Sequence, residues 1–165
     1  MIILLADDER MIRLGLKSML GELYPNMLTY IEARNGKELS NLAREHKPHI
    51  AFVDINMPLL NGLDAIEECK ESTPLTQWIM LTCYSDFEYA QQAIKLGVSD
   101  YLLKPIGIQE LGQVVEKNIA NIKLQISKLN HSFALNMISN YHTSQICDNN
   151  KEYPPMDPTQ DKFNI

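Results

Sequence analysis

Polar side chains follow four of the short apolar runs in this sequence, and their types suit metal-assisted phosphoryl chemistry. They are Asp7 and Asp8 after residues 2–6, Asp54 after 50–53, Thr82 after 78–81 and Lys104 after 101–103. Three carboxylates brought together repel one another, so at neutral pH they need a cation or a retained proton. Mg²⁺, a hard ion with oxygen ligands, meets that need and draws in a phosphate. A lysine and a hydroxyl then stabilise a phosphoryl group in transit to a carboxylate nucleophile.

Each of these residues also has an ordinary structural interpretation when it is taken alone. An acidic pair such as Asp7-Asp8 commonly begins a helix, where it favours the helix dipole. Asp54 alone could be a turn residue, and Lys104 could simply end a strand. The joint placement of all these side chains at strand ends is what predicts a common site.

The elements that must position these side chains are five apolar runs and the helical segments between them. The runs cover residues 2–6, 28–33, 50–53, 78–81 and 101–103, which are strand lengths. The helices are expected on four patterns and after Pro105: Met11, Leu14, Met19 and Leu23; Leu39, Leu42 and Ala43; Leu63, Ile66 and Cys69; Phe87, Ala90, Ile94 and Leu96. Ser85 or Asp86 would cap the fourth helix and Gly97 would close it. Strand alternating with helix predicts an α/β protein whose parallel sheet is covered on both faces.

Ligands of such a sheet bind outside the carboxyl ends of its strands, which is where the polar side chains fall. The formal net charge of −6 over 165 residues argues against nucleic acid or an anionic membrane as a partner. The three cysteines form no zinc or disulfide pattern, which favours a cytoplasmic protein. The N-terminus has no basic region, and its apolar run is too short for a signal peptide or a membrane span.

A heptad-like pattern follows the last strand and predicts a long C-terminal helix. Its apolar positions are Ile119, Ile122, Ile126, Leu129 and Phe133. We expect a globular domain over residues 1–125, a helical extension over 126–142 and a flexible tail over 143–165. Ile122, Ile126, Leu129 and Phe133 are candidate self-association residues. The alternative is that Ile119 and Ile122 form the core face of the last helix.

Four motifs together resemble the response-regulator receiver domain of two-component systems, along residues 1–120. They are Leu5-Ala6-Asp7-Asp8-Glu9, Asp54-Ile55-Asn56-Met57-Pro58, Leu81-Thr82 and Tyr101-Leu102-Leu103-Lys104-Pro105. Residues 84–90 and 93–98 are similar to those of receivers joined to AraC-type DNA-binding output domains. The resemblance implies a flavodoxin-like, doubly wound sheet of five parallel strands in the order 2-1-3-4-5. It also implies a cis peptide between Lys104 and Pro105.

The resemblance further implies a role for each site residue. Asp54 is the expected phosphoacceptor. Mg²⁺ is the expected cofactor, held directly by Asp8 and Asp54, mostly through water by Asp7, and by the backbone carbonyl of Asn56. The residues expected to contact the phosphoryl group or to switch with it are Lys104, Thr82 and the aromatic rotor Tyr101.

The expected function is a signalling switch rather than a catalytic enzyme, with only self-phosphotransfer and autodephosphorylation as its own chemistry. Its expected partners are a sensor histidine kinase and, after phosphorylation, a second copy of the chain. Residues 106–165 hold five Lys and Arg against six Asp and Glu, which is too few basic residues for an AraC-type DNA reader. The output is therefore transcription through a domain outside this chain, or protein contacts made by a stand-alone receiver.

Three other functions share part of this pattern but fit it less well. A haloacid-dehalogenase-like phosphatase also uses an aspartyl phosphate, but it needs a second acid where this chain has Asn56. A flavin-binding module needs a phosphate-cradling loop, whereas Asp7-Asp8-Glu9 repels phosphate. A degenerate receiver is disfavoured because all five site residues are present.

Overall fold

The computed structural model describes the backbone of residues 1–83 and 87–148 and the side chains of residues 1–83 and 89–132. Its centre is a sheet of five parallel strands in the order β2-β1-β3-β4-β5, as the resemblance implied. The strands are β1 (Ile2–Ala6), β2 (Thr29–Ala33), β3 (Ile50–Asp54), β4 (Gln77–Thr82) and β5 (Asp100–Leu103). The strands end level with one another: Ala6 pairs with Ala33, Asp54 with Leu81, and Thr82 with Leu103.

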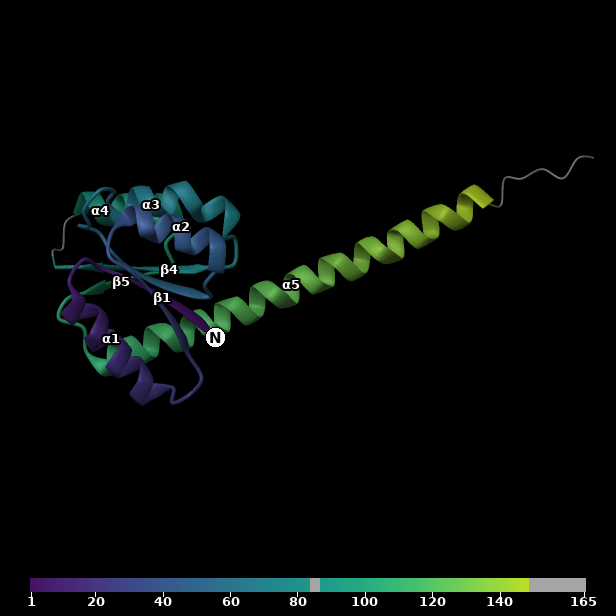
Figure 1. Ribbon diagram of the computed structural model, residues 1–165. Helices are drawn as coiled ribbons and strands as arrows, with labels where there is room; N and C mark the ends of the chain where they lie inside the picture. The colour runs from purple at the N-terminus through teal and green to yellow at the C-terminus, as the bar shows by residue number, and fades with distance from the viewer. Residues whose placement is uncertain (84–86, 149–165) are drawn as a thin grey trace, which may run out of the picture. The chain divides into compact units, whose positions relative to one another are not determined.

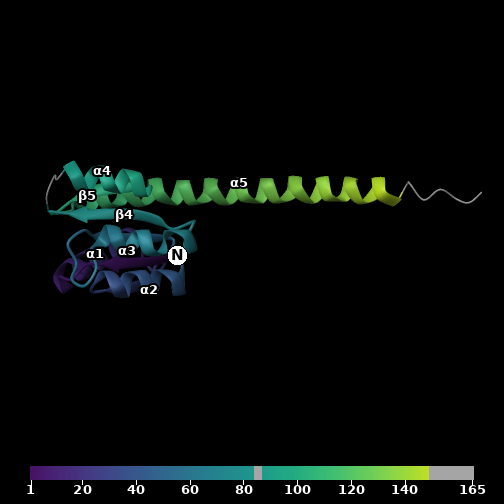
Figure 2. The same cartoon turned by 90° about the horizontal axis from the view of Figure 1, so that it is seen from above.

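Helices cover both faces of this sheet. They are α1 (Arg10–Leu23), α2 (Gly36–His46), α3 (Gly62–Cys69), α4 (Phe87–Leu96) and α5 (Ile108–Asp148), and a short 3-10 turn at Lys70–Ser72 follows α3. The first turns of α5 and the whole of α1 lie on one face, and α2, α3 and α4 lie on the other (Figure 1). Figure 2 shows α2, α3 and α4 side by side in that order across their face.

Two apolar cores result, because successive strand residues point to opposite faces. Leu4, Val53 and Met80 pack with α2 and α3 on one face, and Leu5, Phe52 and Ile79 pack with α1 and α5 on the other. All six of these side chains are fully buried. Burial of each contributes roughly 1.5–3 kcal/mol, so both layers hold the sheet in place. This double coverage explains why the strands are continuously apolar in the sequence.

Helix α1 packs on a different face from the one that its spacing indicated. Met11 and Leu14, two of the residues whose spacing predicts this helix, are 74% and 41% exposed. The buried side chains are instead those of Arg13, Leu16 and Leu20. The helix carries apolar residues on more than one side, and the sheet face that it meets selects among them. The helix lies where the sequence predicted it, and the structure decides which of its side chains are buried.

Helix α4 shows a similar difference. Ile94, one of the residues whose spacing predicts this helix, is 78% exposed, whereas its neighbour Ala93 is buried. Gly97 closes the helix with φ +77°, a left-handed conformation that glycine adopts without steric cost, as expected. The expected caps Ser85 and Asp86 and the side chain of Phe87 lie outside the described residues.

Two glycines allow the loop after β3 to lie close to its neighbours. A Cβ on Gly62 would come within 2.1 Å of the carbonyl oxygen of Asp54, and one on Gly36 within 2.0 Å of that of Leu60. Only glycine fits such close backbone approaches. Asn61 then caps α3 by accepting a hydrogen bond from the Asp64 N–H at 2.9 Å. These contacts hold the loop that follows Asp54.

The chain divides by its internal contacts into Met1–Gln125 and Ile126–Ile165. Helix α5 continues to Asp148, past residue 142 where we expected the extension to end. Residues 149–165, within the expected flexible tail, lie outside the described residues, and the three-part division of the chain stays a prediction. No helix within the described parts of the chain is long and apolar enough to cross a membrane.

Candidate functional site

Lys104, Asp7 and Asp54 meet at the carboxyl end of the sheet. The Lys104 Nζ lies 2.6 Å from Asp7 Oδ2 and 2.7 Å from Asp54 Oδ1. The three side chains are 8%, 1% and 9% exposed, so the ion pairs are largely shielded from water. The structure therefore brings together three of the side chains that the strand-end pattern selected. One ammonium here serves two carboxylates.

The end of β5 positions Lys104. Its backbone N–H donates to the Thr82 carbonyl at 2.7 Å, which continues the pairing of β4 and β5 by one residue. The Lys104–Pro105 peptide is cis, as expected. Thr82 is the last residue of β4 and is 2% exposed. Strand pairing thus places Thr82 and Lys104 at the same end of the sheet.

The ionisation of this cluster follows from its burial and its charges. Burial is the largest influence on Asp54 and raises the pKa of its carboxyl, aided by the Asp7 charge and opposed by the Lys104 hydrogen bond and charge. For Lys104, burial works to lower the pKa, but the hydrogen bonds and charges of Asp54 and Asp7 outweigh it and the pKa is raised. The ammonium is thus held charged between two carboxylates, and burial makes the ionised form of Asp54 less favourable than it is in water.

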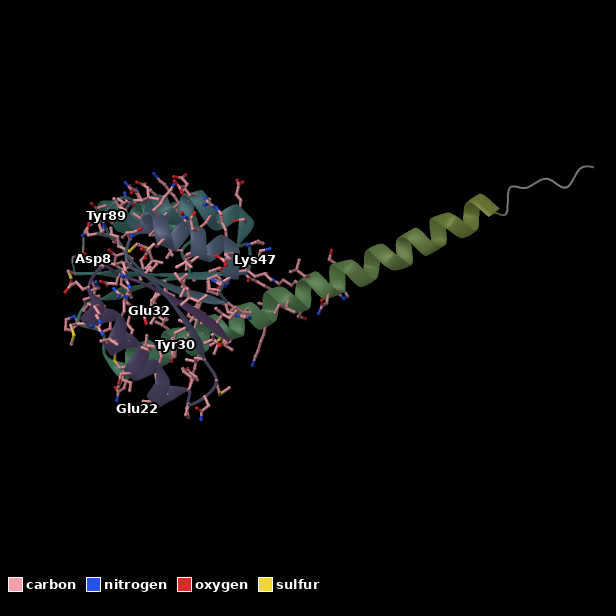
Figure 3. All side chains as sticks on the ribbon, in the orientation of Figure 1. Asp8, Glu22, Tyr30, Glu32, Lys47 and Tyr89 are labelled. Atoms are coloured by element: carbon pink, nitrogen blue, oxygen red, sulfur yellow. The ribbon has the colours of Figure 1, made fainter. Side chains whose placement is uncertain are left out.

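The residues around Asp54 and Asp7 differ in exposure. The Glu9 N–H donates to Asp7 Oδ1 at 2.9 Å, and the Asn56 N–H donates to Asp54. Asp8 is exposed and lies where β1 meets α1 (Figure 3). Asn56 is also exposed and lies two residues after the end of β3.

A metal ion at this end of the sheet would need several oxygen ligands. Within the described residues, no group of three His, Cys, Asp or Glu side chains lies close enough to hold one. Lys104 takes the cation's place between Asp7 and Asp54, while Asp8 faces solvent. The donor chemistry nevertheless fits Mg²⁺, because two buried carboxylates already share one cation and Asp8, the next residue after Asp7, is a further carboxylate at this end of the sheet.

Arg13 and Glu32 belong to the site's surroundings and were not expected. The buried Arg13 donates through Nη1 to the Asp7 carbonyl at 2.7 Å and to the Asp8 carbonyl at 3.4 Å. Its Nε donates to Glu32 Oε2 at 3.1 Å. No sequence signal singled out Arg13, because the apolar pattern of α1 did not show that position 13 lies on the buried face with Leu16 and Leu20.

Tyr101 and the self-association residues are placed as follows. Tyr101 is half-buried and lines a groove of about 290 Å³ together with Ala93, Ile94 and Val98.

Ile122 is 7% exposed and belongs to the core on the α1 side, as the alternative interpretation of this position requires. Ile126 and Leu129 are 42% and 55% exposed. The side chain of Phe133 lies outside the described residues.

Residues 3–116 match the response regulator receiver domain family, and the chain belongs to that family. Receiver domains are signalling phosphoacceptors rather than catalytic enzymes. They pair with sensor histidine kinases and typically use Mg²⁺. The chain is thus the receiver domain of a two-component response regulator.

Individual relatives carry regulatory names. The chain is 37% identical over 123 residues to the uncharacterized transcriptional regulatory protein YesN of Bacillus subtilis, covering 74% of this chain and 33% of YesN. It is 34% identical over 134 residues to the transcriptional regulatory protein HptR of Staphylococcus aureus, covering 80% of this chain and 52% of HptR. It therefore spans about a third to a half of the length of these curated relatives.

Solved receivers share the fold. The receiver domain of AraT, a response regulator from Geobacillus stearothermophilus, superposes with a TM-score of 0.67 at 37% identity over 75% of this chain and 96% of that one. A CheY-like receiver from Methanospirillum hungatei superposes with a TM-score of 0.70 at 21% identity over 75% of this chain and 97% of that one, which supports the fold alone.

Proposed function

We propose that Asp54 accepts a phosphoryl group from a sensor histidine kinase. The observation that carries this proposal is the shared ammonium: Lys104 lies 2.7 Å from Asp54 Oδ1 in a buried cluster. An oxygen of Asp54 attacks phosphorus as the bond to the donor breaks, and an aspartyl phosphate forms. Lys104 then has a phosphoryl oxygen to neutralise in place of the carboxylate charge.

Asp7, Asp8, Asp54 and the backbone carbonyl of Asn56 are the residues that would hold Mg²⁺. The ion would supply positive charge against the phosphoryl oxygens. This chain's own residues do the remaining work: Lys104 keeps Asp54 and Asp7 in one cluster, and the Asn56 N–H restrains the Asp54 carboxylate.

Asp54→Asn is the direct test of this assignment. An amide is a poor nucleophile, so the variant should incorporate no phosphate from acetyl phosphate in the presence of Mg²⁺. Mass spectrometry of the intact protein measures the incorporation. Glu22→Gln, at an exposed position of α1, is the matched control and should behave as wild type. Undiminished incorporation in Asp54→Asn would refute the proposal.

Thr82 and Tyr101 are the proposed switch. If the Thr82 hydroxyl moves toward the phosphoryl group, it vacates space that the Tyr101 ring can enter. Tyr101 lines the groove between α4 and β5, so a change in its position would reshape that surface. A difference of only a few kcal/mol between the two states lets phosphorylation shift their populations.

The groove beside Tyr101 is the proposed self-association surface, and its occupant is a second copy of this chain. Ile94, which lines the groove, is 78% exposed on α4, and Leu103 is 48% exposed on β5, so these two elements offer apolar area for a symmetric contact. The later positions of the helical seam, Ile126, Leu129 and Phe133, are a second proposed contact.

Sedimentation with and without beryllofluoride, a phosphoryl mimic, separates the two contacts. Wild type should dimerise when the mimic is added. In Ile94→Glu the mimic should no longer promote association. Leu129→Glu should lose only the association that depends on the helical seam. Met27→Glu, another exposed apolar position, is the matched control. A wild type that stays monomeric at high concentration with and without the mimic would rule out both contacts.

The output that best fits the relatives is transcription, exerted by a domain outside this chain, in the cytoplasm. YesN and HptR are both named transcriptional regulatory proteins, and both extend well beyond the part that this chain matches. A stand-alone receiver acting by protein contacts is the alternative. The test is the reading frame downstream of residue 165: a basic DNA-binding domain there supports transcription, and a stop codon supports the alternative.

A further inference from the structure

We infer that Arg13 is a positioning residue for the metal-binding turn at Asp7 and Asp8. The inference rests on the proposed function, because it concerns how this chain prepares two of the proposed Mg²⁺ ligands. Arg13 is not one of the acidic, hydroxyl or lysine residues that form the proposed phosphorylation site.

The first argument is the location of Arg13. Its side chain is 5% exposed on the core face of α1, one turn before Leu16. Removing a guanidinium from water costs several kcal/mol unless every charge and donor is well paired, and an apolar residue of similar size often serves stability better. Packing alone therefore does not explain a buried arginine on this face, because its desolvation opposes folding.

The second argument is what the guanidinium contacts. The ladder between β1 and β2 ends at the pair Ala6 and Ala33, and its last backbone bond runs from the Asp7 N–H to the Ala33 carbonyl at 3.2 Å. The carbonyls of Asp7 and Asp8 lie past the end of that ladder. Arg13 Nη1 donates to both of them, so the side chain takes the role that a strand partner has earlier in β1.

The third argument is how Arg13 itself is held. Glu32 Oε2 accepts from Arg13 Nε, while Glu32 Oε1 accepts from Lys17 at 2.9 Å. Glu32 is on β2 and lies beside α1 (Figure 3). The two hydrogen-bonded cations also hold the pKa of Glu32 below its usual range, first through Lys17 and then through Arg13. The anchor therefore stays charged at neutral pH.

These contacts matter most for Asp8. The Asp7 carboxylate has its own partners, Glu9 and Lys104, whereas the Asp8 side chain is exposed. Fixing the peptides on either side of Asp8 leaves its carboxylate only two side-chain torsions to order when a metal binds. Groups that orient metal ligands without touching the metal typically change metal affinity 10–100-fold when they are removed.

Charge alone predicts the opposite effect. A positive guanidinium near a cation site repels the cation, so deleting Arg13 would tighten Mg²⁺ binding if charge were its only influence. If Arg13 positions the turn, deleting it weakens binding. The direction of the change therefore separates the two roles.

The experiment is calorimetric titration of the unphosphorylated chain with Mg²⁺. Arg13→Met should raise the dissociation constant about tenfold. Lys17→Met is the matched control, because it removes the other cation on Glu32 without touching either carbonyl, and should keep the wild-type affinity. Arg13→Lys keeps the charge but loses the planar fork, so its affinity should lie between those of wild type and Arg13→Met.

A second measurement separates positioning from a purely structural role. At saturating Mg²⁺, Arg13→Met should take phosphate from acetyl phosphate at the wild-type rate, because Asp54, Lys104 and Thr82 are unchanged. Lower thermal stability with unchanged or tighter Mg²⁺ binding would overturn the inference. If Arg13→Met does not fold, Arg13→Lys carries the test, and wild-type affinity in that variant overturns it. Absence of Mg²⁺ binding in wild type would overturn the proposed metal site as well, whereas the outcomes above leave it standing.

Discussion

The two ends of the sheet bury polar groups in opposite ways. At the carboxyl end, the buried groups are charged: Lys104 shared between Asp7 and Asp54. At the other end, next to the start of β4, they are neutral. Gln77 is 4% exposed, donates to Gln125 Oε1 at 3.1 Å, and accepts from the Ser99 hydroxyl at 3.1 Å.

The difference separates a cluster that supports the fold from one that supports chemistry. Neutral amides and hydroxyls that find partners contribute modestly to stability, roughly 0.5–1.5 kcal/mol for each hydrogen bond. Buried charges lose several kcal/mol of hydration each, and here two anions compete for one cation. Selection for stability alone favours the neutral solution at both ends, so the charged end is retained for what it does.

The largest effect should come from removing the shared cation. Lys104→Met leaves Asp7 and Asp54 buried without their common partner and should lower the free energy of unfolding by about 3 kcal/mol in metal-free buffer at neutral pH. Urea titration measures it. The double variant Lys104→Met with Asp54→Asn removes an anion together with the cation and should recover part of the loss, as a double-mutant cycle reveals. Equal losses in the single and double variants would contradict the shared-cation account.

A smaller effect of opposite sign is expected for Asp54→Asn. Burial raises the folded-state pKa of Asp54, so its contribution to stability is greatest below the unfolded-state pKa of about 3.9 and falls as pH rises through the folded value. The amide does not ionise, and Lys104 keeps Asp7. The variant should therefore be more stable than wild type at neutral pH, by a margin that grows as pH rises above about 4. Urea titrations at a series of pH values check this, and a margin that shrinks with pH would be contrary evidence.

At the neutral end, removing one hydrogen-bond partner should lower the free energy of unfolding by about 1 kcal/mol. Gln125→Leu removes the acceptor for Gln77 Nε2, which still donates to the Leu75 carbonyl at 3.3 Å. Gln113→Leu, at an exposed position of α5, is the control for the change in side-chain type. The loss should be the same at pH 5 and 8 and with or without Mg²⁺. A loss that varied with Mg²⁺ would mean that the two ends of β4 are coupled.

The smallest effect is expected where the cation of an ion pair stays in solvent. Lys117 is 57% exposed and pairs with Asp100, whose side chain is 14% exposed, so its ammonium remains hydrated, unlike that of Lys104. Lys117→Met should lower the free energy of unfolding by no more than about 0.5 kcal/mol, and added salt should reduce the difference further. A loss near that of Lys104→Met would show that burial is not what sets the two pairs apart.

Sequence reasoning reached the fold and much of the candidate site because both rest on local signals. The alternation of apolar runs with helical segments implied a parallel sheet covered on both faces, and the strand ends placed Asp7, Asp54 and Lys104 together. It did not reach the face of α1, since Met11 and Leu14 are as apolar as the buried Leu16 and Leu20. It also did not show which apolar residues of α4 are buried, since Ile94 is exposed beside the buried Ala93.

The sequence by itself determined which residue types stand at the carboxyl ends of the strands, because apolar periodicity and strand length are properties of neighbouring residues. Only the tertiary structure decided how those groups share their charges. It set Lys104 between two carboxylates, left Asp8 in solvent, and brought Arg13 of α1, which Glu32 of β2 holds, to the turn at Asp7 and Asp8. These outcomes depend on distances between residues far apart in the chain, which packing of helices against the sheet fixes and no local pattern records.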